Sequence, residues 1–298
     1  MLIEQFIEIL STQKRYSKHT LKAYAKDLDQ LQIFLSNTFE IQIQYNSVNK
    51  IRHVHLRTWL AFLTEQGITA KTIARKLSSV KSFFKYLKKI ACIETNIASK
   101  LSAPKLSKKL PSFVLDKQMQ LLFEKVVFPE GFKGIRDKMV LELFYMTGMR
   151  REELINLKVS DFNIENGVIK IRGKGNKERL VPLHPNILQK LKVYIIAKDD
   201  SFKKTNHQQL FVTDKGKPMY PNFVYRLVKK YLSAITTLEK KSPHILRHTF
   251  ATHLSNNGAD LNAIKELLGH SSLAATQTYT HNSIKKLKDI YKQAHPKA

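Results

Sequence analysis

A stretch rich in proline and lysine, residues 99–112, divides this chain of 298 residues into two parts. It contains two prolines and four lysines, and its apolar residues show no sustained helical periodicity. Such a composition is typical of an exposed connection between domains. We therefore predict a domain at residues 1–100, a linker at 101–112 and a second domain at 113–298.

The first part has the apolar periodicity of a small all-helical domain. Its last predicted helix runs from about Thr69 to Lys89 and turns one apolar face inward. Acidic residues are lacking within that segment, so its cations have no partners at helical spacing. We predict that they bind a DNA backbone, with an ordinary solvated lysine face as the alternative. The cations are Lys71, Arg75, Lys81, Lys85 and Lys88.

The balance of charge over the whole chain indicates a polyanionic partner. Lys and Arg number 51 against 24 Asp and Glu, which gives a formal net charge of +27. A chain this basic most often binds nucleic acid. A ribosome-associated protein, or one that is merely soluble and basic, is the alternative.

The cysteine content and the first residues favour a cytoplasmic protein. The single cysteine, Cys92, excludes an intramolecular disulfide, and we interpret it as a small core residue in a reducing compartment. The apolar N-terminal segment also carries Glu4 and Glu8, which predicts an amphipathic helix and not a signal peptide. No apolar run approaches the roughly 18 residues that a membrane span needs.

The second part combines helical patterns with a short pair of strands. The sequences GVIKIRG and ERLVPL alternate apolar residues and flank the turn GKGNK, which predicts a small antiparallel sheet in a mainly α domain. Lys174 lies in this turn, where a lysine can swing towards a substrate. The full phosphate-loop pattern is absent, so the turn does not indicate an ATP site.

An arginine stands at an unusual place in this part. Arg150 follows Thr147-Gly148 and opens the next predicted helix, REELINLKV. The N-terminal end of a helix already favours anions. A cation at this place therefore suggests that the helix end and the Arg150 side chain together hold an external anion. A surface arginine paired with Glu152 or Glu153 is the alternative.

A stretch near the C-terminal end, residues 242–279, places polar residues around helix boundaries. Ser242 and Pro243 predict a helix start, and His244 and Arg247 then lie on one face of that helix.

Two further helices are predicted within this stretch. Asp260 caps a helix that ends at Gly269, and His270 follows directly. A third short helix, from about Ser272, carries Tyr279. This arrangement of polar groups is suited to phosphate chemistry.

Four motifs carry a resemblance to a known family. TGMRREEL, GKGNKERLVPL, HILRHTFATHL and LLGHSSLAATQTYTH occur in that order. They closely resemble motifs of the tyrosine site-specific recombinases of the phage integrase family, nearest to the bacterial XerC/XerD group. The similarity extends over essentially the whole chain. No departure is found at the six positions that the family uses, which are Arg150, Lys174, His244, Arg247, His270 and Tyr279.

The resemblance implies a fold and an assembly. The expected fold is mainly α, with an N-terminal four-helix SAM-like core-binding domain and a catalytic domain of the DNA breaking-rejoining type. The expected assembly is a C-shaped clamp on duplex DNA, with four protomers on two recombination sites that exchange strands through a Holliday junction. The partners would be copies of this chain or a paralogous recombinase.

The residues themselves suit a phosphoryl transfer. Tyr279 would attack a phosphodiester and form a 3′-phosphotyrosyl linkage, while Arg150 and Arg247 offer paired donors to the non-bridging oxygens. Lys174 is suited to protonate the departing 5′-oxygen. His244 and His270 add hydrogen bonds, and the residues leave open which of them accepts the tyrosyl proton. Such chemistry needs no cofactor and no metal.

A zinc site is the alternative use of the histidines. His244 and His248 are four residues apart, and His253, His270 or His281 would complete such a site. No H-E-x-x-H pattern occurs, and the nearby arginines would oppose a cation. We interpret His248 and His253 as residues that orient their neighbours, and Tyr220, Tyr225 and Tyr291 as packing or surface groups.

The last segment, residues 283–298, has an apolar stripe that must be buried somewhere. The family inserts this segment into the neighbouring protomer, and packing on its own chain is the alternative. In the family, the XerC/XerD group resolves chromosome dimers at dif-like sites during cell division, and a septal DNA translocase is a candidate regulator. There are two competing hypotheses. One is an integrase of a mobile element with the same chemistry, and the other is a non-catalytic DNA clamp. The DNA target cannot be derived from the sequence.

Overall fold

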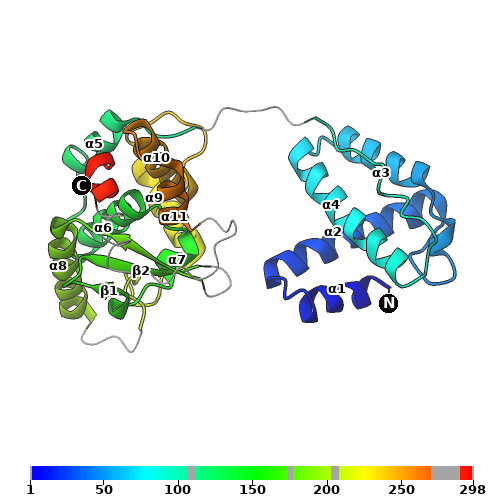
Figure 1. Ribbon diagram of the computed structural model, residues 1–298, viewed down its shortest axis with the longest axis horizontal. Coiled ribbons are helices and arrows are strands. Elements are labelled where there is room, and N and C mark those ends of the chain that lie inside the picture. The colour runs from blue at the N-terminus through cyan, green and yellow to red at the C-terminus, as the bar shows by residue number, and fades with distance from the viewer. Residues whose placement is uncertain (1, 106–111, 174–176, 203–207, 270–288, 297–298) are drawn as a thin grey trace. The chain divides into compact units, whose positions relative to one another are not determined.

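We describe a computed structural model of the chain at residues 2–105, 112–173, 177–202, 208–269 and 289–296. The chain divides into two compact units, residues 1–109 and 110–298, each with its own hydrophobic core (Figure 1). The division falls within the predicted linker. Lys174, His270 and Tyr279, and residues 283–288 of the tail, lie outside the described residues.

Unit 1 is an all-helical bundle, as the apolar periodicity predicts. Trp59 is fully buried in its core, to which Leu101 also belongs. The helices are α1 (Leu2–Thr12), α2 (Lys18–Phe39), α3 (His53–Glu65) and α4 (Ala70–Lys89), with a short 3-10 turn, η1 (Val48–Lys50).

The boundaries of these helices follow from local chemistry. The Ser17 hydroxyl accepts a hydrogen bond from the Thr20 amide at 3.2 Å and begins α2. Thr69 begins α4 in the same way. Between α3 and α4 the chain turns at Gly67, whose φ of 71° is a conformation that glycine adopts without strain.

A buried carboxylate joins α2 to α4. Asp27 accepts hydrogen bonds from both terminal nitrogens of Arg75, one of them at 2.8 Å, and from Lys76 at 3.2 Å and Ser79 at 2.9 Å. The acidic partner that is lacking within α4 is therefore supplied by another helix. Arg75 is not the unpaired cation that the sequence predicts.

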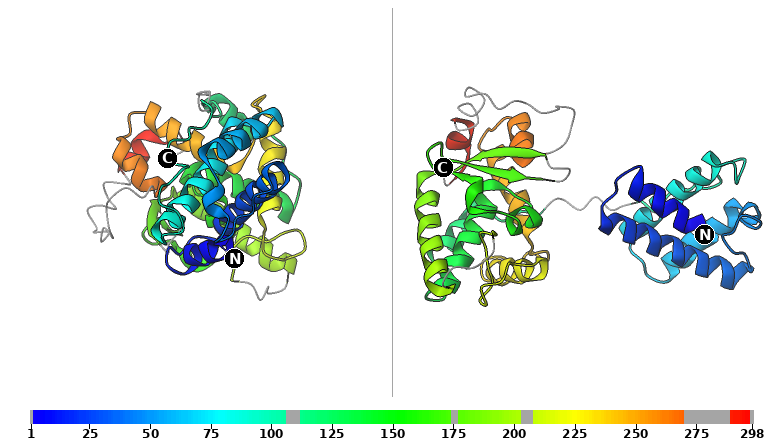
Figure 2. Two further views of the ribbon diagram at one scale, coloured as in Figure 1. Left: turned by 90° about the vertical axis from the view of Figure 1, so that its right-hand side faces the viewer. Right: turned by 90° about the horizontal axis from the view of Figure 1, so that it is seen from below.

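Unit 2 is mainly helical, with α6 at its centre. In Figures 1 and 2, α6 lies between α8 and α10, and 12 of its 16 residues are buried. The helices are α5 (Asp116–Glu124), α6 (Phe132–Thr147), α7 (Arg151–Ile155), α8 (Pro185–Phe202), α9 (Pro221–Ser233), α10 (Pro243–Asn256) and α11 (Leu261–Leu268), with a 3-10 turn η2 (Val159–Asp161).

The sheet of unit 2 has three antiparallel strands in the order β1-β2-β3. The predicted hairpin is confirmed as β2 (Val168–Arg172) and β3 (Glu178–Pro182), with Ile169 opposite Val181. The strand β1 (Phe162–Asn163) was not predicted, since two residues are too few for an alternation to be recognised.

Gly148 fixes how the chain leaves α6. Its φ of 56° is in the left-handed region, and its amide donates to Phe144 O, which ends the helix. A Cβ there would lie 2.5 Å from Phe250 Cδ1 and 2.8 Å from Leu268 Cδ2. Glycine is therefore required for its conformation and for space. The chain then passes directly into Arg150 and α7.

The described part of the C-terminal tail packs on its own chain. Residues 289–294 are helical, and Tyr291 is buried with its hydroxyl donating to Met146 O at 3.0 Å. Tyr291 also stacks on His295, and Asn257 donates to Ala294 O at 2.8 Å. This is the packing on its own chain that the sequence analysis gave as the alternative. Insertion of residues 283–298 into a neighbour stays a prediction.

Within the described ranges, no helix combines the length and the apolar character that crossing a membrane requires.

Replacing Asp27 tests the buried network of unit 1. Asp27→Asn should destabilise this unit by about 3 kcal/mol, because Lys76 loses its buried counter-charge. Urea unfolding followed by the fluorescence of Trp59, the single tryptophan, reports on unit 1 within the full chain. Asp29→Asn is the matched control, since Asp29 is exposed on the same helix. Equal midpoints for the two variants would contradict the prediction.

Candidate active site

Arg150 occupies the N-cap position of α7 and is held by a residue of the first turn. Its backbone amide donates to Glu153 Oε2 and its Nη1 donates to Glu153 Oε1, both at 2.8 Å. The pairing with Glu153 noted as an alternative is thus present. About two fifths of the Arg150 side chain remains exposed, at 38%, so part of the guanidinium is available to an external anion.

Arg247 reaches the same place from α10. Its side chain is buried and donates to two backbone carbonyls, from Nη1 to Gly148 O and from Nη2 to Leu268 O, each at 2.6 Å. Burial, followed by the charges of Arg150 and Arg179, lowers the pKa of Arg247, and Glu153 partly opposes them, so that the pKa is about 10. The guanidinium stays charged at neutral pH.

Three arginines bind three consecutive carbonyls at the C-terminal end of α11. Arg179 Nε donates to Leu267 O at 2.7 Å, Arg247 Nη2 to Leu268 O at 2.6 Å, and Arg150 Nη2 lies 3.5 Å from Gly269 O. The last carbonyls of a helix have no partners within the helix and carry partial negative charge, so guanidinium groups satisfy them well. The end of α11 therefore gathers Arg150 and Arg247.

Glu153 is the buried acid of this cluster. Besides Arg150, it binds Arg179 through both oxygens, at 3.1 and 2.8 Å. Burial acts to raise the pKa of Glu153, but the bonds and charge of Arg179 and the bonds of Arg150 outweigh it, so the pKa is lowered. The carboxylate is ionised at neutral pH and offsets part of the positive charge.

Two glycines border the cluster. A Cβ on Gly173 would lie 3.4 Å from Glu153 Oε1 and 4.0 Å from Arg150 Nη1, and one on Gly269 would lie 3.0 Å from Arg179 Cδ. These glycines directly precede Lys174 and His270 in the sequence. The residues that directly precede Lys174 and His270 therefore lie next to the arginine cluster.

Comparison with known proteins identifies the family. A model of the phage integrase family matches residues 113–286, and one of the phage integrase N-terminal SAM-like domain matches residues 3–90. The chain belongs to the phage integrase family. It is a tyrosine recombinase, a DNA breaking-rejoining enzyme, and the expected SAM-like and catalytic domains are confirmed.

Relatives match this recombinase over its full length. It is 36% identical to the tyrosine recombinase XerC of Chlorobaculum parvum, over 99% of this chain and 94% of that protein. It is also 36% identical to the tyrosine recombinase XerD of Staphylococcus haemolyticus, over 100% and 99%. The solved XerH site-specific recombinase bound to difH substrate, a pre-cleavage complex, is 26% identical with a TM-score of 0.71 over 96% of this chain and 83% of that chain.

His244 lies exposed on α10 of the recombinase, three residues before Arg247. Its predicted role, like those of the other five site residues, stays a prediction at this point. The helix begins as predicted, with Ser242 as its N-cap residue and Pro243 in the first turn, although the Ser242 side chain makes no capping hydrogen bond. Asp260 does cap α11, accepting from the amides of Asn262 and Ala263 at 2.9 and 3.1 Å.

Arg179 is the residue that the sequence analysis missed. The alternation of β3 places Arg179 on the same side of the strand as Val181, and both are buried. A long cation at a core-facing position of a predicted strand is the signal that could have indicated it, since buried charges require partners.

His253 has a structural role in this recombinase. It is buried, its Nε2 donates to Val114 O at 2.8 Å, and its Nδ1 lies 2.9 Å from the Tyr145 hydroxyl. Burial lowers the pKa of His253 more than Asp116 and the bond to Val114 raise it. This agrees with the prediction that His253 orients its neighbours. Among the residues that the structure describes, no group of three metal-ligating side chains occurs.

The predicted DNA-binding cations lie along α4. Lys71, Lys85 and Lys88 are exposed and Lys81 is half-buried, while Arg75 is exposed but bound to Asp27. Three of the five predicted cations on this helix are therefore exposed to a polyanion.

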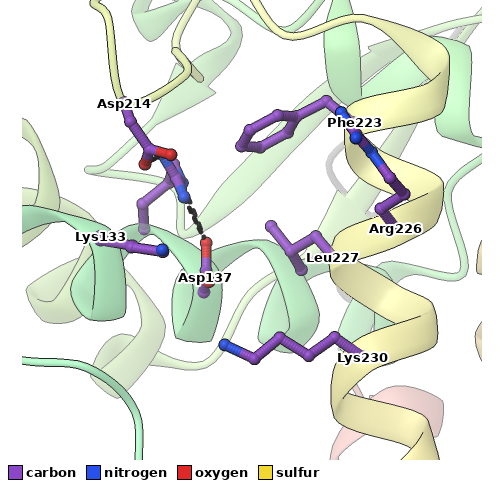
Figure 3. A pocket seen from close by; sticks show the side chains of 8 residues that line it. Lys133, Asp137, Asp214, Phe223, Arg226, Leu227 and Lys230 are labelled. Atoms are coloured by element: carbon purple, nitrogen blue, oxygen red, sulfur yellow. Dashed lines mark hydrogen bonds and ion pairs between the residues drawn. The ribbon is translucent and has the colours of Figure 1, made fainter.

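A small cavity of about 190 Å³ lies elsewhere in unit 2 (Figure 3). It is lined from α6 and α9, by residues that include Lys133, Asp137, Arg226 and Lys230. Arg150, His244 and Arg247, the predicted site residues that the structure describes, do not line it. Lys133 belongs to the first turn of α6, whereas Arg150 follows the last, so the cavity is separate from the arginine cluster.

The lowered pKa of Glu153 makes a pH-dependent contribution to stability. A carboxyl group with a lowered folded-state pKa stabilises the fold above its unfolded value, and this contribution is lost as the pH falls through the folded value. Glu153→Gln should therefore destabilise unit 2 by about 3 kcal/mol at pH 7, and by progressively less below about pH 4.5.

Urea unfolding followed by circular dichroism between pH 7 and pH 3 measures this difference. Glu152→Gln is the control, because Glu152 is the neighbouring residue and its side chain is 59% exposed. A constant difference between wild type and Glu153→Gln across this range would contradict the assignment.

Proposed function

We propose that this recombinase cuts and rejoins duplex DNA through a 3′-phosphotyrosyl intermediate formed by Tyr279. The observation that carries the proposal is the convergence of Arg150 and Arg247 on adjacent carbonyls at the end of α11. Two permanently charged guanidiniums at one place suit the two non-bridging oxygens of a single phosphodiester. The part of Arg150 that stays exposed provides access for that anion.

The remaining predicted residues complete the reaction. Lys174 protonates the departing 5′-oxygen, and the fact that its neighbour Gly173 adjoins Arg150 supports this role. His244 and His270 donate further hydrogen bonds, and one of them accepts the proton of Tyr279. An aryloxide leaves more readily than an alkoxide, so the phosphotyrosyl linkage stays activated and a 5′-hydroxyl can reseal the strand.

The biological role that we propose is the resolution of chromosome dimers at a dif-like site during cell division, in the cytoplasm. The support is full-length identity of 36% to both a XerC and a XerD, together with likeness to a XerH bound to difH DNA. Equal identity to XerC and XerD fits a tetramer of either one gene product or two paralogues, on two DNA sites. A septal DNA translocase is the proposed regulator.

We further propose that residues 283–298 leave their own chain when the tetramer forms and insert into the neighbouring protomer. The support is that Met146 O and the Asn257 side chain each bond to the tail, from Tyr291 and to Ala294 O, and the same tail residues of a neighbouring chain could make these bonds.

A nicked suicide duplex that carries the recombination site tests the chemistry. The wild type should become covalently trapped, whereas Tyr279→Phe should bind the duplex within about twofold of the wild-type affinity and form no covalent product, since the nucleophilic oxygen is missing. Denaturing gels and gel shifts measure the two properties. Trapping by Tyr279→Phe would assign the nucleophile to another residue.

The same trapping reaction, applied to fragments of the source genome, tests the biological role. Enrichment of one chromosomal site outside any mobile element is the expected result. Enrichment at the ends of a mobile element would instead favour the integrase hypothesis.

Deletion of residues from Ser283 onward tests the tail. The truncated protein should bind a single half-site with nearly unchanged affinity but assemble less cooperatively on a full site. Gel shifts with half-site and full-site duplexes distinguish these outcomes, and circular dichroism checks that unit 2 is folded. Unchanged cooperativity would show that the tail has no part in assembly.

A further inference from the structure

Arg179 is a buried arginine with all three of its side-chain nitrogens engaged. Nε donates to Leu267 O at 2.7 Å, and Nη1 and Nη2 donate to the two oxygens of Glu153 at 3.1 and 2.8 Å. Its residue exposure is only 4%. A guanidinium placed in this way is not presented to DNA, so its role must be exerted through its partners.

The first partner leads to Arg150. Glu153 uses the same two oxygens to bind the amide and Nη1 of Arg150, each at 2.8 Å. Arg179, Glu153 and Arg150 therefore form one chain of charge-assisted hydrogen bonds from β3 to the N-terminal end of α7. Without Arg179, the buried Glu153 carboxylate would keep Arg150 as its sole arginine partner among the described residues and would draw its guanidinium inward.

The second partner leads to Arg247. Leu267 O, which Arg179 binds, directly precedes Leu268 O, which Arg247 binds. Gly269 packs so closely on Arg179 that a Cβ would lie 3.0 Å from its Cδ. Arg179 thus fixes the position of the C-terminal end of α11 relative to the sheet. It thereby also fixes the position of Leu268 O, the carbonyl that binds Arg247.

We propose that Arg179 is a positioning residue of the strand-cleavage site, because it holds Arg150 through Glu153 and holds Arg247 through the C-terminal end of α11. It does not contact the phosphate. The proposal rests on the roles of Arg150 and Arg247 given under the proposed function. It adds a third arginine, whose function is to set the spacing of the other two.

Single-turnover cleavage of the suicide duplex, with protein in excess over DNA, tests the proposal. Arg179→Met should lower the rate constant by about 10²-fold, the cost typical of a misplacement of about 1 Å, while the fraction of DNA finally cleaved stays near that of wild type. Arg179→Lys should recover only part of the rate, since an ammonium cannot hold Glu153 bidentately and Leu267 O together. A merely structural role would lower the final fraction and leave the rate constant unchanged, which would overturn the proposal.

Arg136 supplies a matched control. It is also a buried arginine of unit 2, and it binds Asp137 Oδ1 through Nε and Nη2 at 3.0 and 2.7 Å and Asp214 through Nη1 at 2.6 Å, beside the cavity of Figure 3. Arg136→Met should lower the thermal midpoint as much as Arg179→Met does, without the loss of rate. Equal losses of rate in the two variants would assign the effect of Arg179 to general stability.

A double-mutant cycle with Arg150→Lys separates this proposal from the proposed function. If Arg179 acts on Arg150, the combined loss of rate should be at least tenfold smaller than the product of the separate losses. If the two losses of rate simply multiplied, the role of Arg179 would be overturned and the proposed function would stand. The same holds if Arg150→Lys lowered the rate and Arg179→Met did not. A wild-type rate in Arg150→Lys would instead contradict the proposed function.

Discussion

The C-terminal end of α11 is the feature on which the candidate site depends. Its last carbonyls have no partners within the helix, and three arginines from β3, α7 and α10 satisfy them. Like charges this close would repel one another, but the partial negative charge of the helix end and the ionised Glu153 offset the repulsion. The backbone carbonyls at the end of α11 therefore set the positions of these arginines independently of a bound phosphate.

The sequence predicted the fold well because its helices carry strong local signals. Ser17, Thr69 and Asp260 begin their helices, and Gly67 and Gly269 mark turns, all through interactions that involve only neighbouring residues. The six site residues were likewise named from motifs, and Arg150 and Arg247 do converge in space.

Contacts between distant segments were beyond such reasoning. The sequence showed no acidic partner for Arg75 within its helix, yet Asp27 of α2 binds it. Arg179 escaped notice because its partners, Glu153 and Leu267, lie 26 and 88 residues away. Pairing of charges between distant segments depends on the whole fold, whereas helix caps and turns depend on neighbouring residues. The caps and turns could therefore be predicted from the sequence, and the buried ion pairs could not.

The docking of the tail has a consequence for communication within an assembly. Tyr291 and His295 lie against the backbone of Met146 and Tyr145, in the last turn of α6, and that helix ends only three residues before Arg150. Withdrawal of this segment would remove hydrogen bonds from the last turn of α6, which precedes Arg150, a residue for which we propose a role in phosphate binding. If the tail leaves its own chain on assembly, as proposed above, a subunit with a docked tail and one without it would differ in the rigidity of the last turn of α6, and therefore in how firmly Arg150 is held.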